Sequence, residues 1–200
     1  MSDLPSVLIT GASSGIGATY ADRFARRGHD LVLVARDKAR PDALAERFRA
    51  ETGVAADVIQ ADLTDAGDLE VVEARLRDDA RIGVLVNNAG LSVAGRFDRQ
   101  AAADLERLVA VNTTAVLRLA HAVSARFVET GQGAIISVGS AVSLVPEFGQ
   151  TVYGATKAFV LYLSQGLASD LGPKGVYVQA VLPAATGTEI WSRAGADPSQ

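Results

Sequence analysis

The pair Tyr153 and Lys157 is the sharpest chemical signal in the sequence. The two residues lie four apart within a helix predicted over 152–171, so both side chains project from one face. A free tyrosine has a pKa near 10, too high for a base at neutral pH, and a neighbouring ammonium group favours the phenolate. We therefore expect Lys157 to lower the pKa of Tyr153, which would exchange a proton with a substrate oxygen. An amphipathic pair on a helix surface is the alternative.

Other residues able to do chemistry come directly after predicted strands. Ser140 follows a strand predicted at 134–138, and the run Asn-Asn-Ala-Gly at 87–90 follows one predicted at 82–86. The carboxyl ends of parallel strands share one edge of a sheet, where ligands bind. Polar residues and glycines gathered there are typical of a site and not of a core. The presence of Ser140 and of the run at 87–90 at the same sheet edge favours the catalytic interpretation of Tyr153.

A glycine-rich turn joins the first predicted strand to the first predicted helix, with the sequence Thr10-Gly11-Ala12-Ser13-Ser14-Gly15-Ile16-Gly17. Its spacing, G-x-x-x-G-x-G, differs from the common G-x-G-x-x-G dinucleotide fingerprint but shares its physics. Glycine lets the backbone approach a pyrophosphate, and the helix N-terminus offers N–H groups and a partial positive charge. A tight turn without a ligand is the alternative. If the turn does bind a dinucleotide, the expected contacts are Gly11, Ser13, Ser14, Ile16 and Gly17.

The residue after the second predicted strand bears on the choice of dinucleotide. An acid about 20 residues after the glycine-rich turn usually binds the adenosine ribose hydroxyls. Here the strand ends at Ala35, and Arg36 follows. Arginine is always charged, and its fork can bind a phosphate bidentately. The absence of an acidic residue at this position and the presence of Arg36 favour NADP(H) over NAD(H), with Arg36 bound to the 2′-phosphate. The alternative is that Arg36 is a solvated side chain at a strand end.

Strand-like and helix-like stretches alternate along the chain. The predicted strands cover residues 7–10, 31–35, 54–61, 82–86, 134–138 and 176–181. The predicted helices cover residues 15–27, 42–51, 65–79, 101–128 and 152–171. Apolar strands separated by helical crossovers predict an α/β fold with a parallel sheet covered on both faces. We expect a single doubly wound Rossmann-type domain over residues 1–200, with strand order 3-2-1-4-5-6.

Composition narrows the classes of partner. The net charge of −4 argues against nucleic-acid binding, and the absence of cysteine excludes disulfides and thiolate metal sites. With only two histidines, we expect no catalytic metal site. The first residues lack a signal-peptide pattern, and no apolar run approaches the roughly 18 residues that span a bilayer. We expect a cytoplasmic protein with no membrane or nucleic-acid partner.

Taken together, these motifs resemble the short-chain dehydrogenase/reductase family, in its NADP(H)-preferring form. The resemblance runs from Ser6 to about Thr188, and its motifs stand in family order: the glycine-rich turn, Asp62-Leu63, Asn87-Asn88-Ala89-Gly90, Asn112, Ser140, and Tyr153 with Lys157. It implies an enzyme that transfers hydride. Its implied catalytic residues are Asn112, Ser140, Tyr153 and Lys157.

The resemblance also implies individual roles. Asp62 and Leu63 would lie beside the adenine ring, with Asp62 accepting from its amino group. Asn112 would help to hold a water on a proton path to Lys157; an asparagine that merely kinks the helix is the alternative. Ser140 would bond the substrate oxygen, and Lys157 would also bind the nicotinamide ribose. Further cofactor contacts would come from Asn88, Ala89, Gly90, Tyr153, Pro183 and Thr188.

The chain departs from the family pattern near its end. Ala184 follows Pro183 where the family often has glycine, in a turn that shapes the nicotinamide pocket. Members usually continue through a substrate lid, another helix and a seventh strand. We therefore expect a chain truncated in the lid region after about residue 188, with the seventh strand missing. The resemblance further implies a homodimer or homotetramer, in which the helices beginning near 101 and 152 pair across a two-fold axis.

These observations favour one function among several. The mostly apolar stretches 91–95 and 142–148 suggest a small hydrophobic substrate with one carbonyl. The favoured function is an NADP(H)-dependent oxidoreductase that moves a hydride between nicotinamide and a carbonyl or secondary alcohol. The main alternative is a cofactor-binding protein without turnover, acting as a redox sensor or partner subunit. An epimerase or dehydratase would use the same Tyr–Lys pair but usually needs a larger substrate domain.

Overall fold

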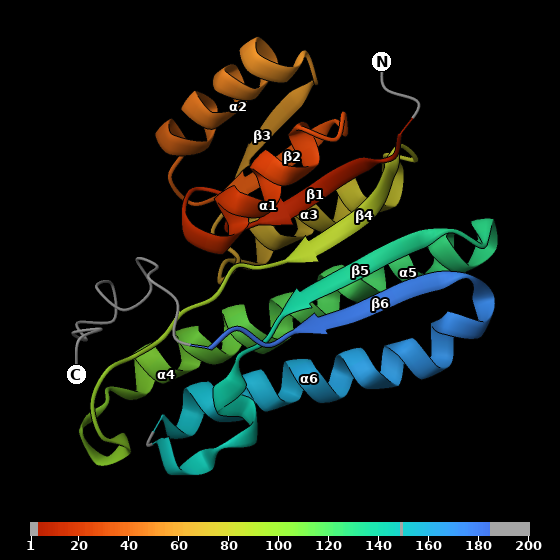
Figure 1. Cartoon of the computed structure of the whole chain (residues 1–200). Coiled ribbons are helices and arrows are strands. Elements are labelled where there is room, and N and C mark those ends of the chain that lie inside the picture. The colour runs from red at the N-terminus through yellow and green to blue at the C-terminus, as the bar shows by residue number, and fades with distance from the viewer. Residues whose placement is uncertain (1–3, 149, 185–200) are drawn as a thin grey trace.

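The structure is a computed structural model that describes residues 4–148 and 150–184. A parallel sheet of six strands forms its centre, in the order β3-β2-β1-β4-β5-β6, which confirms the predicted order (Figure 1). The strands are β1 (Ser6–Thr10), β2 (Leu31–Ala35), β3 (Ala56–Gln60), β4 (Ile82–Asn87), β5 (Gly133–Val138) and β6 (Val176–Val181). β1 and β2 are buried along their whole length, as expected for strands covered on both faces.

Helices cover the two faces of the sheet unequally. On one face, α1 (Gly15–Ala25) and α2 (Ala39–Thr52) pack over β1 to β3 and bury Ala21 and Phe48. On the other face lie α3 (Ala66–Asp78), α5 (Val116–Thr130) and α6 (Thr151–Leu171), with Val72 and Leu119 in the second core. The strands therefore separate two apolar layers, and the site residues at the strand ends are held from both sides.

The long helix predicted over 101–128 is present as a continuous helical stretch, Ala102–Thr130, but it is not α-helical throughout. The stretch consists of α4 (Ala102–Val109), a π-helical segment η2 (Ala110–Ala115) and then α5. Asn112 lies inside this π-helical segment and is fully buried. Single π-helical turns inside α-helices occur frequently at functional sites. The distortion thus coincides with one of the residues that the family resemblance selects.

The continuous helical stretch Ala102–Thr130 has the length and apolar composition of a membrane span. This departs from the expectation that no segment approaches such a length. Core helices pass the same test, however, and Leu108, Leu119 and Val123 of this stretch are buried inside the protein. The stretch is therefore weak evidence for a membrane.

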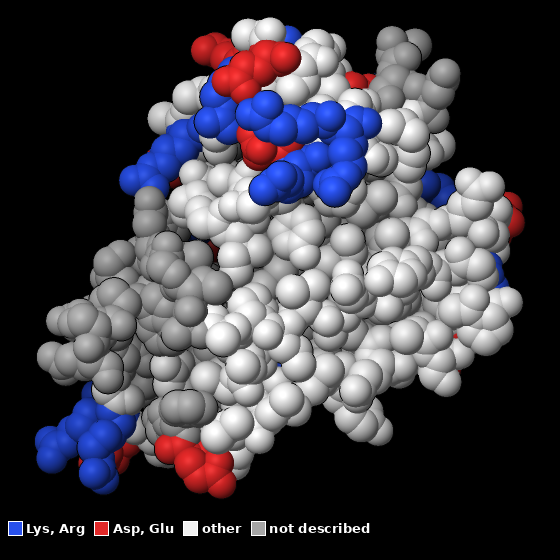
Figure 2. Space-filling view, viewed as in Figure 1, with Lys and Arg blue, Asp and Glu red and all other residues white. Residues whose placement is uncertain are grey.

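In the part of the chain that the structure describes, the sheet face beside α1 is bare over its last two strands. Of the described helices, none lies over β5 and β6 on the side that α1 and α2 cover (Figure 1). Tyr177 and Gln179 of β6 are accordingly exposed there. Figure 2 shows that Lys and Arg gather over α1 and α2, whereas the surface over the last strands is almost free of charge.

Candidate active site

A cavity of about 1010 Å³ lies beyond the carboxyl ends of the strands. Its lining comes from the segments that follow each of the six strands, together with α4 and α6. This is where ligands bind in doubly wound folds. The sequence-predicted site residues that line it are Gly11, Ser13, Ser14, Ile16, Arg36, Asp62, Leu63, Asn88, Ala89, Gly90, Ser140, Tyr153, Lys157 and Pro183.

Three predicted site residues are not among the lining. Gly17 and Asn112 lie behind it, and Thr188 lies outside the described residues. Residues 91–94, from the stretch that the sequence associates with the substrate, also line the cavity, and so do residues that the sequence reasoning missed: Asp37, Arg40, Asp104, Arg107 and Val111. The last three have helical spacing, which could have suggested one shared face, but no motif marks that face as part of a site.

The glycine-rich turn is fastened to the loop after β4. The Thr10 hydroxyl accepts hydrogen bonds from the backbone N–H groups of Asn88 and Ala89, both at 3.0 Å. Asn88 Nδ2 in turn donates to Thr10 O and Gly11 O at 2.9 and 3.1 Å. Gly11 has a φ of +65°, and a Cβ there would lie 2.8 Å from Ala89 Cα. Only glycine fits this position, so the turn leaves its backbone open to the cavity.

Gly17 serves the packing of the turn. A Cβ at Gly17 would lie 2.3 Å from Gly11 O and 2.4 Å from Asn88 Nδ2. Its absence lets α1 begin directly at the cavity wall, where no side-chain hydrogen bond from Ser14 caps the helix. The first N–H groups of a helix and its dipole favour an anion. The turn therefore fits the pyrophosphate of a dinucleotide.

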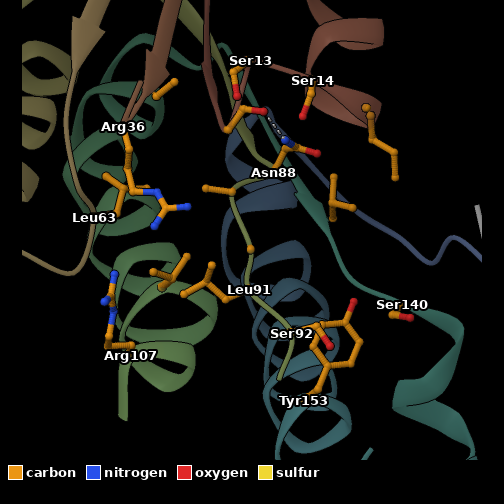
Figure 3. Close-up of a pocket in the computed structure, with 18 of the residues that line it drawn as sticks. Ser13, Ser14, Arg36, Leu63, Asn88, Leu91, Ser92, Arg107, Ser140 and Tyr153 are labelled. Carbon is orange, nitrogen blue, oxygen red and sulfur yellow. Dashed lines mark hydrogen bonds between the residues drawn. The ribbon is translucent and has the colours of Figure 1, made fainter. Parts of the chain in front are cut away.

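Charged side chains gather at the end of the cavity that Arg36 and Leu63 line (Figure 3). The carboxyl group of Asp62 lies there, 3.9 Å from the guanidinium of Arg107. Burial raises the pKa of Asp62, but hydrogen bonds from Thr64 and the charges of Arg36 and Arg107 outweigh it, so the pKa lies below its usual range. Asp62 is therefore ionised at neutral pH.

The opposite end of the cavity holds Tyr153 and Ser140 (Figure 3). Ser140 begins the short helix η3 (Ala141–Leu144), and its hydroxyl accepts from Val142 N at 3.4 Å. Lys157 is buried one turn along α6 from Tyr153, with its Nζ 5.7 Å from the centroid of the Tyr153 ring. The Lys157 ammonium donates to Val138 O at 2.8 Å. Three of the four predicted catalytic side chains, those of Ser140, Tyr153 and Lys157, thus meet at one end of the cavity.

The electrostatics of this group differ from the sequence-based expectation. Burial raises the pKa of Tyr153, and hydrogen bonding with the Ser140 hydroxyl only partly opposes the rise. Burial lowers the pKa of Lys157 to about 8. The expectation that Lys157 lowers the pKa of Tyr153 is therefore wrong for this structure, because its ammonium is bonded to Val138 O and desolvation dominates. The phenol keeps its proton at neutral pH.

Asn112 connects three segments behind the cavity. Its Oδ1 accepts from Leu91 N at 2.8 Å, and its Nδ2 donates to Leu91 O at 2.9 Å and to Thr156 Oγ1 at 3.1 Å. Thr156 in turn donates to Tyr153 O at 2.7 Å. Asn112 therefore fixes the loop after β4 against α6 beside the reacting group. Its predicted part in a water-mediated proton path stays a prediction.

The part of the chain that the structure describes contains no group of three or more His, Asp or Glu placed to hold a metal ion.

Comparison with known proteins identifies the family. The model of the short chain dehydrogenase family matches residues 5–199. A short-chain dehydrogenase from Sphingobium yanoikuyae, solved in complex with NADPH, has 66% sequence identity and a TM-score of 0.97, covering 98% of this chain and 77% of that chain. The bulky-bulky ketone specific alcohol dehydrogenase from Comamonas testosteroni has 64% identity and a TM-score of 0.92, covering 93% of this chain and 75% of that chain.

A curated relative widens the comparison. The very-long-chain 3-oxoacyl-CoA reductase from Anas platyrhynchos is 34% identical over 190 residues, which are 92% of this chain and 60% of the reductase. The chain therefore spans about 60% of the length of that relative. The matches agree on one class: this chain belongs to the short-chain dehydrogenase/reductase family, as the order of its motifs predicts.

Proposed function

We propose that the protein is an NADP(H)-dependent oxidoreductase that transfers a hydride between nicotinamide and a carbonyl or secondary alcohol. The observation that carries this proposal is the cavity that runs from the glycine-rich turn to Tyr153, with Ser140 and Lys157 beside the tyrosine. One end suits a pyrophosphate and adenosine, and the other holds a proton donor. Its relatives that are named for such activities support the same reaction class.

The chemistry divides among three side chains. A bound nicotinamide supplies the hydride in the reductive direction. Tyr153 gives its phenolic proton to the substrate oxygen; the phenol is protonated at neutral pH because its pKa lies above the ordinary value near 10. Ser140 donates a hydrogen bond to the same oxygen, which strengthens as negative charge grows in the transition state. Lys157 is mostly cationic at neutral pH, so its ammonium can donate hydrogen bonds to the nicotinamide ribose.

The preference for NADP(H) over NAD(H) rests on Arg36. This side chain lines the cavity at the end where Asp62 and Leu63 lie, and an uncharged Ala35 precedes it. The relative from Sphingobium yanoikuyae was solved with NADPH, which supports the assignment. We expect Arg36→Met to weaken NADPH binding by the loss of a charge-assisted hydrogen bond, about 1.5–3 kcal/mol, and to leave NADH binding nearly unchanged. Equal losses for both cofactors would refute the assignment to the 2′-phosphate.

The substrate is a neutral, hydrophobic ketone or the corresponding alcohol. Leu91, Ser92 and Ser140 line the cavity on the side of Tyr153 (Figure 3), and none of them is charged. The relative from Comamonas testosteroni is described as specific for bulky-bulky ketones. Among the described residues that line this region, only Lys157 could offer a charge to a substrate carboxylate or phosphate, which would lose its hydration there.

The protein is a cytoplasmic homodimer in this proposal. The helices that the family resemblance assigns to the dimer are α5 and α6, together with α4. They carry exposed apolar side chains, as expected for a surface that a second copy covers. These are Val109, Leu117, Phe159 and Tyr162.

A substrate panel tests the proposal directly. The full-length protein is mixed with NADPH and a set of neutral ketones that carry small or bulky groups, and cofactor oxidation is followed by absorbance. Turnover of hydrophobic ketones is the expected result. Binding of NADPH without turnover of any ketone would favour the alternative, a cofactor-binding protein. Failure to bind either NADPH or NADH would contradict both.

A further inference from the structure

We propose that Arg107 is a positioning residue for the adenine of the cofactor, because its guanidinium and the Asp62 carboxylate face each other as a donor–acceptor pair across the end of the cavity. The inference rests on the proposed function, since it requires a nicotinamide dinucleotide in this cavity. Arg107 would then read the base, whereas Arg36 reads the phosphate beside it.

Arg107 reaches the cavity from a different element than the other cofactor contacts. It lies on α4, and Figure 3 shows its guanidinium and that of Arg36 at the same end of the cavity, near Leu63. Val111, one helical turn further along, lines the cavity as well. The Arg107 side chain is 53% exposed, so it keeps donors available while its stem lies along the wall. Leu63 and Val111 supply apolar surface suited to an aromatic base.

Asp62, the partner of Arg107, is held in place by hydrogen bonds within the turn that follows β3. Asp62 Oδ1 accepts from Thr64 N at 3.0 Å and from Thr64 Oγ1 at 2.8 Å. The backbone N–H of Asp62 donates to Asp68 Oδ2 at 2.8 Å. These bonds fix the carboxyl group so that Oδ2 is the oxygen nearest Arg107. Asp62 is thus positioned before any ligand arrives.

The separation of the two groups leaves both of them able to bind. Oδ2 of Asp62 lies 3.9 Å from Arg107, beyond the roughly 3.2 Å limit of a good hydrogen bond. The pair is therefore held by charge alone, and neither the oxygen nor the guanidinium is saturated. Asp104, which precedes Arg107 by three residues on α4, also lines the cavity and adds a second negative charge near the guanidinium.

The edge of adenine matches this pair. It carries an amino donor next to a ring nitrogen acceptor. A carboxylate oxygen can accept from the amino group while a guanidinium donates to the ring nitrogen, and charged partners make such bonds stronger than neutral ones. Because the base is common to NADPH and NADH, Arg107 contributes equally to both. This distinguishes its role from that of Arg36, whose effect depends on the 2′-phosphate.

Equilibrium binding to the full-length protein tests the role of Arg107. The dissociation constants of NADPH and NADH are measured by calorimetry for the unmodified protein and for Arg107→Met. We expect both constants to rise by the same factor, about threefold to tenfold. The matched control is Arg99→Met, which removes the same charge from an 83% exposed side chain outside the cavity lining and should leave both constants unchanged.

Further measurements separate the inference from its alternatives. The melting temperature of Arg107→Met should stay unchanged, because a loose exposed ion pair contributes little to stability. Combining Arg107→Met with Asp62→Asn should cost less than the product of the two single effects, since the residues act on one base. An effect confined to NADPH, or no effect at all, would overturn the role of Arg107. Failure of the unmodified protein to bind either cofactor would instead contradict the proposed function.

Discussion

Tyr153 carries its proton at neutral pH, since the pKa of a free tyrosine is already near 10 and burial raises it further, so the phenol is present as a proton donor. Tyr153→Phe keeps the ring and its packing but removes that proton. We expect ketone reduction to fall by roughly 10²- to 10⁴-fold, the usual worth of general acid catalysis, while NADPH binding survives. Tyr162→Phe, on the same helix but 81% exposed, is the matched control and should keep full activity. Substantial turnover by Tyr153→Phe would show that another group supplies the proton.

Lys157 couples the stability of the fold to pH. Its pKa is about 8 in the folded protein, against 10.5 for an unperturbed lysine. Between these values the unfolded chain binds more protons than the folded one, so the free energy of unfolding rises with pH. Relative to Lys157→Met, the unmodified protein should gain about 3 kcal/mol across this window. Urea unfolding at a series of pH values measures the difference, and parallel curves for the two proteins would contradict it.

Among the elements, the junction of β1 and α1 depends on a glycine that has no contact with the cavity. A Cβ at Gly17 would meet the backbone oxygen of Gly11 at 2.3 Å, and backbone cannot move aside cheaply. We expect Gly17→Ala to destabilise the protein by about 1–3 kcal/mol, as overpacking does, and to weaken NADPH binding by shifting the turn. Thermal unfolding and cofactor titration measure both effects.

The matched control for this change is Gly166→Ala. Gly166 lies in the exposed middle of α6, where a Cβ would meet nothing within 4 Å. Since alanine favours helix, this variant should be stabilised by up to about 1 kcal/mol. If Gly17→Ala behaved like Gly166→Ala, the close packing of the turn would not be needed for the fold.

The elements that sequence predicts well are those whose cause is local. The strands stand out because parallel strands buried on both faces must be apolar runs, as Leu31–Ala35 is. The glycine-rich turn and the residues after β4 and β5 follow from the same logic, since strand ends define the site edge. For these parts, the type and spacing of residues along the chain contain the information.

The parts that the sequence does not predict depend on distant contacts. Residues 110–115 have ordinary helical character, and their π-helical form accompanies bonds from Asn112 to Leu91 and Thr156, which are 21 and 44 residues away. Arg107 faces the cavity because α4 runs beside the cavity, and no sequence motif predicts that position of α4. The pKa of Tyr153 is a balance of burial against the hydrogen bond with Ser140, and burial is a property of the folded chain.

At the scale of the whole molecule, the apolar side chains of α5 and α6 offer a surface for a second copy. Tyr162 is 81% exposed on α6. Tyr162→Arg would place a charge in the proposed interface, where an unpaired buried charge costs several kcal/mol. We expect the dimer of the full-length protein to become a monomer at micromolar concentration, as measured by light scattering after gel filtration. Tyr177→Arg, on the bare face over β6, is the matched control and should remain a dimer.

If the unmodified protein is already a monomer at this concentration, the proposed dimer is contradicted. Dissociation caused by Tyr177→Arg instead of Tyr162→Arg would move the interface to the bare face of the sheet.

The two ends of the cavity should respond differently to ionic strength. Arg36, Arg40 and Arg107 line the cavity at the proposed adenosine end and are exposed, whereas the charge beside Tyr153, among the described residues, belongs to the buried Lys157. Dissolved ions screen exposed charges over about 10 Å at 0.1 M but reach buried ones far less. Added potassium chloride should therefore raise the KM for NADPH and leave kcat nearly constant in steady-state assays. A parallel fall in kcat would mean that the surface arginines also act on the hydride step. If kcat stays constant, the exposed arginines act on cofactor binding alone, and the buried end of the cavity carries out hydride transfer independently of ionic strength.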